Sequence, residues 1–432
     1  MIPESITSLS GRSAELNARL ESWANINSGS GHAAGLARMA AELRAVFSAA
    51  FPAATCEELS ADAPGFNPPG ARALRFRLRP TAARQVLLCG HYDTVYGADD
   101  AFQTCRWLDD GTLNGPGVTD MKGGLVVLLA ALEAFEQTPS AANLGWEVLL
   151  TPDEETGSHG TRAMFEAAAR HNHFGFVFEP ARPSGDIIHS RKGTGGMVVT
   201  CRGRAAHAAK IPNDGRSAIL GLAAFLLAAA KIPAELPGVL VNAGNIRGGS
   251  AATNVVPDFA QAELDLRITR MAEQKPLFAR LEALARETEA AHEVKLELQG
   301  GLNRPPKENH PTEAALFPAF QRAAQDVGLK PFGWVHSGGA SDGNFLGAAG
   351  LPCFDGIGPE GDHLHSAREF CRVGTIVPRA QNVALFLHRL AAGEIMLPVS
   401  VTVGGALRPD SAGGNGVPSG HKAPPTGFAN PP

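Results

Sequence analysis

The chain has 432 residues, of which 44% are hydrophobic and 19% charged, so it is long enough for two or three domains with a sizeable core. Its net charge of −5, without a long basic run, argues against nucleic acid or an anionic membrane surface as its main partner. The N-terminus shows no basic stretch followed by an apolar one, and the most apolar helical stretch, 220–232, is too short to span a bilayer. Six scattered cysteines without a C-x-x-C pair are typical of buried free thiols, so we expect a cytoplasmic protein.

Strands and helices alternate along much of the chain. Short apolar runs predict strands, and longer segments with an apolar face predict helices. In chain order these are a strand at 85–90, a helix at 119–137, a strand at 145–152, a helix at 158–172, a strand at 174–180, and, much later, a helix at 312–328, a strand at 351–359 and a helix at 376–393. The alternation predicts an α/β fold with a doubly wound, mostly parallel sheet.

The pattern changes between these two parts. A strand, a helix, two strands, a helix and a strand are predicted at 195–204, 214–232, 238–248, 258–268, 274–290 and 293–300. This βαββαβ order is typical of a ferredoxin-like domain. We therefore predict that residues 190–302 are inserted into a larger domain formed by 1–189 and 303–396. The Gly- and Pro-rich segment 403–432 is predicted to be a disordered tail.

Polar side chains follow the predicted strands of the larger domain, at the ends where open α/β sheets bind ligands. They are His91, Asp93, Asp120, Asp153, Glu154, Glu155, Glu179, His363 and His365. Each has a plain alternative when taken alone, since a D-E-E run is usually a solvated acidic turn. Their joint occurrence at successive strand ends favours a metal site. Mixed imidazole and carboxylate ligands suit zinc, with manganese and cobalt as alternatives.

The candidate ligands are too many for one tetrahedral zinc that keeps an open position. Two metals about 3.5–4 Å apart, bridged by a carboxylate, would use them all. Of the adjacent Glu154 and Glu155, one can bind a metal while its neighbour takes a proton from the attacking water. Asp93, two residues after His91, can orient that imidazole. This arrangement predicts hydrolysis of a C–N bond.

Five motifs together resemble those of one zinc exopeptidase family. They are GHYDTV, GPGVTDMKGG, TPDEETGSHGTR, FEPAR and HLHSAREF. The family includes glutamate carboxypeptidase (the carboxypeptidase G type), acetylornithine deacetylase, succinyl-diaminopimelate desuccinylase and aminoacylase. The resemblance covers about residues 80–390 and implies two zinc ions per subunit, a catalytic domain of the predicted kind and an inserted lid domain.

The resemblance also implies a role for each metal-site residue. His91 and Glu179 would bind one zinc, and Glu155 and His365 the other. Asp120 would bridge both ions. His365 is preferred to its near neighbour His363, because the family places Ser after its His ligand. Glu154 would be the general base, and Asp93 would orient His91.

In this family the inserted domain joins two subunits, so the resemblance implies a homodimer. GRAAHAA resembles the lid motif whose histidine, here His207, stabilises the oxyanion in a partner subunit's site; the alternative is a surface histidine. NVVPDFAQAELDLRI implies that Asn254 and Arg267 bind the substrate's carboxylate or carbonyl. The alternatives are a turn cap for Asn254 and a solvated strand residue for Arg267.

Three further segments look closest to the glutamate carboxypeptidase branch. DIIHSRKGTGG and GGLNRPP add Lys192 and Arg304 as candidate substrate-binding residues. In SGGASDGNF, Asp342 is expected to cap the helix that follows it.

The leading interpretation is a co-catalytic zinc hydrolase that cleaves an amide bond next to a free carboxylate, as a glutamate-carboxypeptidase-like exopeptidase does. An alternative is a deacylase of N-acetyl or N-succinyl amino acids, which the same metal site could perform. A third is an inactive binding protein on the same fold, against which the presence of Glu154 and of every ligand argues. The expected partners are a small peptide or N-acyl amino acid and a second copy of the chain, without nucleic acid or membrane.

Overall fold

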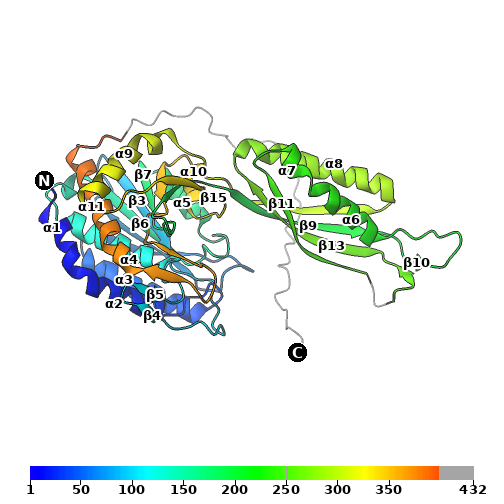
Figure 1. Ribbon diagram of the computed structural model, residues 1–432, viewed down its shortest axis with the longest axis horizontal. Coiled ribbons are helices and arrows are strands. Elements are labelled where there is room, and N and C mark those ends of the chain that lie inside the picture. Colours follow the sequence, from blue (N-terminus) through cyan, green and yellow to red (C-terminus); the bar gives the residue numbers. More distant parts are fainter. Residues whose placement is uncertain (250–251, 398–432) are drawn as a thin grey trace.

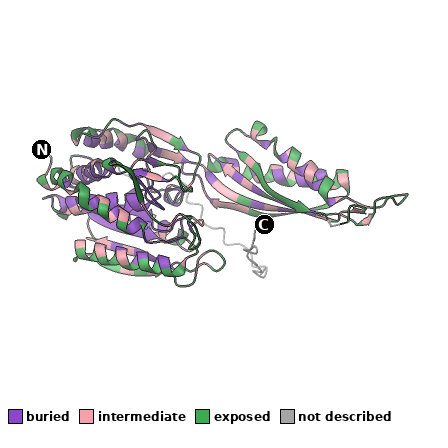
Figure 2. Ribbon diagram, turned by 60° about the horizontal axis from the view of Figure 1, so that its bottom comes forward, coloured by how far each residue is buried: buried purple, intermediate pink, exposed green. Residues whose placement is uncertain are grey.

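The computed structural model describes residues 1–249 and 252–397, and the predicted tail at 403–432 lies outside the described residues. The chain forms a larger unit, on the left in Figure 1, and a smaller, elongated unit, residues 193–304, on the right. Separate clusters of buried side chains fill the two units, as the purple segments of Figure 2 show. Each unit therefore has its own core.

An eight-stranded sheet forms the middle of the larger unit. Its strands, in spatial order, are β1 (Thr55–Ser60), β2 (Arg72–Leu78), β6 (Gly145–Thr151), β3 (Gln85–His91), β7 (Phe174–Val177), β16 (Cys353–Asp355), β8 (Ile187–Arg191) and β15 (Trp334–Ser337). β3 pairs in parallel with β6 and β7, and β16 pairs in parallel with β7. β1 and β2 form an antiparallel edge. The predicted α/β fold with a mostly parallel sheet is confirmed.

Helices cover both faces of this sheet. They are α1 (Glu4–Thr7), α2 (Ser13–Ala24), α3 (Ala33–Ala50), α4 (Lys122–Glu136), α5 (Arg162–Ala169), α9 (Pro311–Asp326), α10 (Gly343–Ala348) and α11 (Ile376–Ala392). Every residue of β3 is buried, because successive side chains point to opposite faces and each face is covered. Val86 and Leu88 join the core under α4 and α11, whereas Leu87 and Cys89 join the core under α5 and α10. The near-continuous apolar run that predicts this strand is thus explained by burial on both sides.

A second, four-stranded sheet lies at the rim of the larger unit. Its order is β17 (Gly361–Asp362), β18 (Phe370–Arg372), β5 (Thr112–Asn114) and β4 (Arg106–Asp109), with antiparallel neighbours. The segment with His363 and His365 runs between β17 and β18, and the segment with Asp120 follows β5. Pairing of β18 with β5 therefore brings these two segments together.

The smaller unit is a four-stranded antiparallel sheet with two long helices on one face (Figure 1). Its strand order is β11 (Leu240–Gly248), β13 (Phe259–Ile268), β9 (Gly193–Arg202) and β14 (Lys295–Arg304), and its helices are α6 (Ala218–Ala229), the short α7 (Ile232–Glu235) and α8 (Gln274–His292). This is the strand order of a ferredoxin-like sheet. Alternate residues of β13, from Ala260 to Ile268, are buried against the helices, and those between them lie on the polar open face.

The far end of the smaller unit carries a two-stranded ribbon of β10 (Ala206–His207) and β12 (Val255–Val256). Close by, the stretch Ala218–Glu235 has the length and composition of a membrane-spanning helix, although one such helix is weak evidence. Its α6 part packs its inner side against the sheet, and it leaves Leu220 63% and Leu227 71% exposed. We interpret this stretch as two helices of the smaller unit, of which α6 is apolar on its packed inner side and also on its exposed outer side.

Two short segments join the units. Lys192 alone separates β8 of the large sheet from β9 of the smaller unit, and β14 returns the chain toward α9. The backbones of Arg191 and Lys307 exchange two hydrogen bonds, of 2.9 and 3.0 Å, so the two crossings lie side by side.

Candidate metal and catalytic site

The carboxyl ends of three neighbouring strands meet at one place. β3 ends at His91, Glu179 follows β7 by two residues, and Glu155 follows β6 by four. The rim segments add Asp120 and His365. The carboxyl ends of neighbouring parallel strands lie at the same edge of the sheet, and the polar residues that follow them are therefore collected there.

The five predicted metal ligands lie together and form two groups with one shared member. His91 Nε2 lies 3.1 Å from Asp120 Oδ1 and 3.6 Å from Glu179 Oε1. His365 Nε2 lies 3.2 Å from Asp120 Oδ2 and 3.2 Å from Glu155 Oε2. In each group the candidate ligand atoms are within 4.8 Å of one another. Asp120 thus faces both groups, one oxygen to each, as a bridging carboxylate would.

The electrostatics of the cluster favour cations. Burial, reinforced by the charge of Asp120, raises the pKa of Glu155 to about 8, and the same causes raise the pKa of Glu179 well above its ordinary value. Hydrogen bonds with Asp120 and Glu155 raise the pKa of His365 to about 11. The raised pKa values show that these crowded carboxylates need a nearby positive charge, which a divalent ion can supply in place of the protons. The oxygen and imidazole donors fit zinc, manganese or cobalt.

Asp93 lies behind His91 and is fully buried. Its carboxylate lies 3.3 Å from His91 Nδ1 and accepts the backbone N–H groups of Glu154 and Glu155, each at 3.1 Å. It also accepts the Ser30 hydroxyl at 2.8 Å. Asp93 therefore holds the imidazole and the acidic loop in one arrangement.

Glu369 is a buried residue of the site to which the sequence analysis gave no role. Its carboxylate accepts the backbone N–H groups of Gly117, Thr119 and Asp120 at 3.0–3.2 Å, and the Tyr96 hydroxyl at 2.7 Å. Burial and the charge of Asp120 raise the pKa of Glu369 to about 7. Its place at the end of the HLHSAREF motif was the available signal. Glu369 fixes the backbone that presents Asp120.

Arg191 supports the opposite side of the cluster and was also not predicted. Its guanidinium binds Asp355 through two hydrogen bonds of 2.6 and 2.7 Å, and Nη2 lies 3.9 Å from Glu179 Oε2. Lys192, the neighbour that the sequence analysis selected instead, lies in the crossing between the units, where its backbone N–H donates to Ser337 O.

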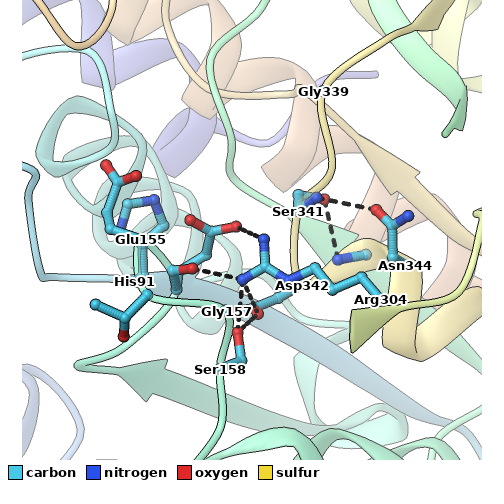
Figure 3. A network of polar contacts seen from close by, with 12 residues as sticks. His91, Glu155, Gly157, Ser158, Arg304, Gly339, Ser341, Asp342 and Asn344 are labelled. Atoms are coloured by element: carbon cyan, nitrogen blue, oxygen red, sulfur yellow. Dashed lines mark hydrogen bonds and ion pairs between the residues drawn. The ribbon is translucent and has the colours of Figure 1, made fainter. Parts of the chain in front are cut away.

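The predicted base Glu154 lies beside the cluster and is paired with Arg304. The Arg304 guanidinium donates to both the Glu154 carboxylate and the Glu154 carbonyl oxygen, and to Ser158 Oγ at 2.8 Å (Figure 3). Arg304 is only 6% exposed, so the structure does not leave it open to a substrate as the sequence analysis expects. The expected cap by Asp342 is wrong: its carboxylate accepts from Ser158 and Thr151 and makes no cap to the following helix.

The remaining predicted residues lie in the smaller unit, away from the cluster. His207 is exposed in β10, at the end of the molecule farthest from the larger unit (Figure 1). Asn254 lies beside it, because the Ala208 N–H donates to Asn254 O at 2.8 Å. Arg267 lies on the open face of β13, where its Nε is 3.0 Å from Asp265. Within one chain these residues do not meet the metal cluster.

Comparisons with known proteins find related sequences and folds. A model described as peptidase family M20/M25/M40 matches residues 87–389. A succinyl-diaminopimelate desuccinylase of Psychrobacter sp. (strain PRwf-1) is 28% identical over 334 residues, covering 71% of this chain and 80% of that protein. Carboxypeptidase G2 of Pseudomonas sp. (strain RS-16) is 24% identical over 383 residues, covering 87% and 89%. The crystal structure of aminopeptidase PepT from Bacillus cereus ATCC 10987 matches the fold with a TM-score of 0.72 at 20% identity, over 88% of this chain and 99% of that one.

Proposed function

Because the chain belongs to peptidase family M20/M25/M40 and is therefore a hydrolase, we propose that it is a two-metal amidohydrolase acting on N-acyl amino acids. The observation that carries this proposal is the bridging position of Asp120 between two ligand groups, with Glu154 beside them. His91 and Glu179 would hold one zinc, and Glu155 and His365 the other, with cobalt and manganese as alternatives. When bound, the metals would act as Lewis acids toward the substrate carbonyl and the attacking water.

The residues of this chain supply the proton transfers. Glu154 lies next to a ligand in sequence, and its carboxylate can accept a proton from the attacking water and return it to the leaving amine. Asp93 keeps His91 in the orientation that presents Nε2 to the metal side. Arg191 holds a positive charge behind Glu179, which limits the repulsion among the carboxylates.

We propose that His207 completes the site of a second copy of the chain. A tetrahedral intermediate requires a donor opposite the metals, and His207 is too far from the cluster of its own chain to supply it. The exposed apolar side of α6, with Ile219, Leu220 and Leu227, and the exposed edge strand β11 beside it offer a surface for a homodimer. Each lid would then lie over the partner's site.

The substrate carries a free carboxylate in this proposal. Asn254, Arg267 and Lys192 supply amide, guanidinium and ammonium donors for it, Asn254 from the same end of the lid as His207. The relatives named as desuccinylases favour deacylation, so we place the N-acyl amino acid deacylase before the glutamate-carboxypeptidase-like exopeptidase. An inactive binding protein is the weakest of the three, since Glu154 and all five ligands are present. We also propose a cytoplasmic location, with which six free cysteines agree.

The test is amino-acid release by the zinc-loaded protein from N-succinyl and N-acetyl amino acids, dipeptides and pteroyl-glutamate-like amides. Glu154→Gln should keep both metals, measured by elemental analysis, and should lose turnover by about 10²- to 10⁴-fold. Glu287→Gln, in an exposed glutamate of α8, is the matched control and should keep its turnover. Release confined to glutamate conjugates would favour the carboxypeptidase. Full turnover in Glu154→Gln would reject the base assignment, and no release from any substrate would reject the substrate class.

A further inference from the structure

The end of β14 touches the loop that carries Glu154. β14 pairs with β9 along the sheet of the smaller unit, but its register shifts between Leu302 and Arg304. Asn303 is the extra residue at this irregularity. Bulges re-aim the side chains beside them. Here Asn303 and Arg304 both reach segment 154–158 of the larger unit.

Two side chains make this connection. Asn303 Nδ2 donates to Gly157 O at 3.3 Å. Gly157 has a φ of +102°, and a Cβ at this position would collide with the Asn303 side-chain amide. Arg304 binds Glu154 at two separate atoms, the carboxylate through Nη1 and the carbonyl oxygen through Nη2. Because the guanidinium is planar and rigid, this pair of bonds fixes the carboxylate relative to its own backbone. A single point charge could not do so.

Further contacts hold the guanidinium itself. Nη2 donates to Ser158 Oγ and lies 3.8 Å from Asp342 Oδ1 (Figure 3). The guanidinium also lies 5.7 Å from the centre of the Phe345 ring. Its Nε is buried without a hydrogen-bond partner among the described residues. A buried guanidinium with one unpaired N–H depends on its remaining hydrogen bonds to offset the cost of burial, and two of these go to Glu154.

We infer that Arg304, supported by Asn303, is a positioning residue that sets the orientation of Glu154 from the end of a strand of the smaller unit. This inference rests on the proposed role of Glu154 as general base. Arg304 then acts on the rate of proton transfer and not on substrate binding. It also ties the base to the smaller unit of its own chain, whose His207 would serve the partner subunit's site in the proposed dimer.

The experiment is a double-mutant cycle on the zinc-loaded protein. Arg304→Gln should lower kcat by about 10- to 100-fold and leave KM within about twofold, with metal content unchanged. In a Glu154→Gln background the same substitution should cost less than about twofold, because the group it positions is already gone. Arg304→Lys should recover only part of kcat, since it restores the charge without the fork.

Two controls keep the outcome interpretable. Arg191→Gln removes another buried guanidinium of the site, and its effect should combine additively with Glu154→Gln because Arg191 acts on Glu179. If Arg304→Gln fails to fold, Asn303→Ala should show a smaller loss of kcat with the same lack of additivity. A rise in KM at constant kcat, or full additivity with Glu154→Gln, would overturn the inference. If Glu154→Gln alone has no effect on turnover, the proposed role of Glu154 as general base is wrong, and this single variant shows it independently of Arg304.

Discussion

Lys122, the first residue of α4, is completely buried, although lysine is seldom found in a protein interior. Its ammonium donates to Ile26 O at 2.7 Å, and among the described residues it makes no ion pair within 4 Å. Burial lowers the pKa of Lys122 to about 8. The charged form of Lys122 is thus disfavoured in the folded state, and the folded protein is less stable at any pH at which this lysine is protonated.

This penalty has a defined pH window. Between pH 8 and the ordinary lysine pKa of 10.5, the unfolded chain binds more protons than the folded one, so the stability contribution of Lys122 rises with pH there and is lost as pH falls through 8. Relative to wild type, metal-free Lys122→Met should therefore be more stable at pH 7 than at pH 10 by about 3 kcal/mol. Urea unfolding in chelator at the two pH values measures this difference. Lys275→Met, at an exposed lysine of α8, is the control, and identical differences at both pH values would contradict the prediction.

Single residues of the site were predictable to different degrees. His91 and Glu179 could be found because each directly follows an apolar run, and Glu155 because it belongs to the acidic segment after the next one. Glu369 stands in the HLHSAREF motif, but that motif does not reveal its role, which consists of accepting N–H groups from a segment about 250 residues away. Arg304 was found as a polar residue of the site, but its burial against Glu154 depends on how two units meet.

At the scale of elements, α4 begins two residues after Asp120, beside the ends of the strands. Gly123 and Gly124 follow Lys122 in the first turn of this helix. Packing requires the second of them to be glycine, because a Cβ on Gly124 would lie 1.9 Å from Phe178 O, directly before Glu179. The helix start and the end of β7 approach this closely only without a side chain.

Gly124→Ala should therefore destabilise the protein, although alanine is more favourable than glycine inside a helix by about 1 kcal/mol. The overlap with the Phe178 carbonyl forces α4 away from β7, and we expect a net loss of about 1–3 kcal/mol together with weaker metal binding. Thermal unfolding and competition with a zinc chelator measure the two effects. Gly11→Ala is the control, since nothing lies within 4 Å of its added Cβ. A stabilised Gly124→Ala variant with unchanged metal affinity would show that the contact is relaxed in solution.

The elements missed by the sequence analysis share a physical reason. β1 and β2 form one edge of the sheet, β8 and β15 form the other, and the rim strands β4 and β17 are short and partly exposed. Edge strands bury one face or none, so their sequences lack the apolar runs that mark β3 and β6. The strands of the smaller unit were visible because its sheet is buried on one face and alternates regularly.

The whole molecule explains why its two groups of predicted residues lie apart. The cluster of candidate metal ligands belongs to the larger unit, while His207 lies at the far end of the smaller one. The sequence reveals the metal-site motifs and the motif with His207, but not the distance between them in space. That distance depends on the length of strands β9 and β13. A second copy of the chain, docked through α6 and β11, would bring the two groups together.

The dimer is testable through α6. Leu220→Glu with Leu227→Glu places charges on its exposed apolar side and should convert a dimer into monomers with little activity, as measured by sedimentation and amino-acid release. Ala45→Glu, at an exposed position of α3 in the larger unit, is the control for added charge. An equal mixture of His207→Ala and Glu154→Gln chains should recover about a quarter of wild-type activity, because half of the dimers then hold one complete site. Monomeric wild-type protein with full activity would exclude the shared site.

The side-by-side crossings of the chain affect the entropy of folding. Seen from the larger unit, residues 193–304 are one long loop between Lys192 and Pro305. Closing a loop of that length restricts the chain by an amount that grows only with the logarithm of its length. Thr194 and Arg304 are register partners, so the sheet of the smaller unit closes this loop as it folds. When the smaller unit folds, it brings the two ends of the insertion together and so offsets the entropy cost of closing this loop in the larger unit. An insertion of this size therefore adds little to the conformational entropy that the larger unit loses on folding.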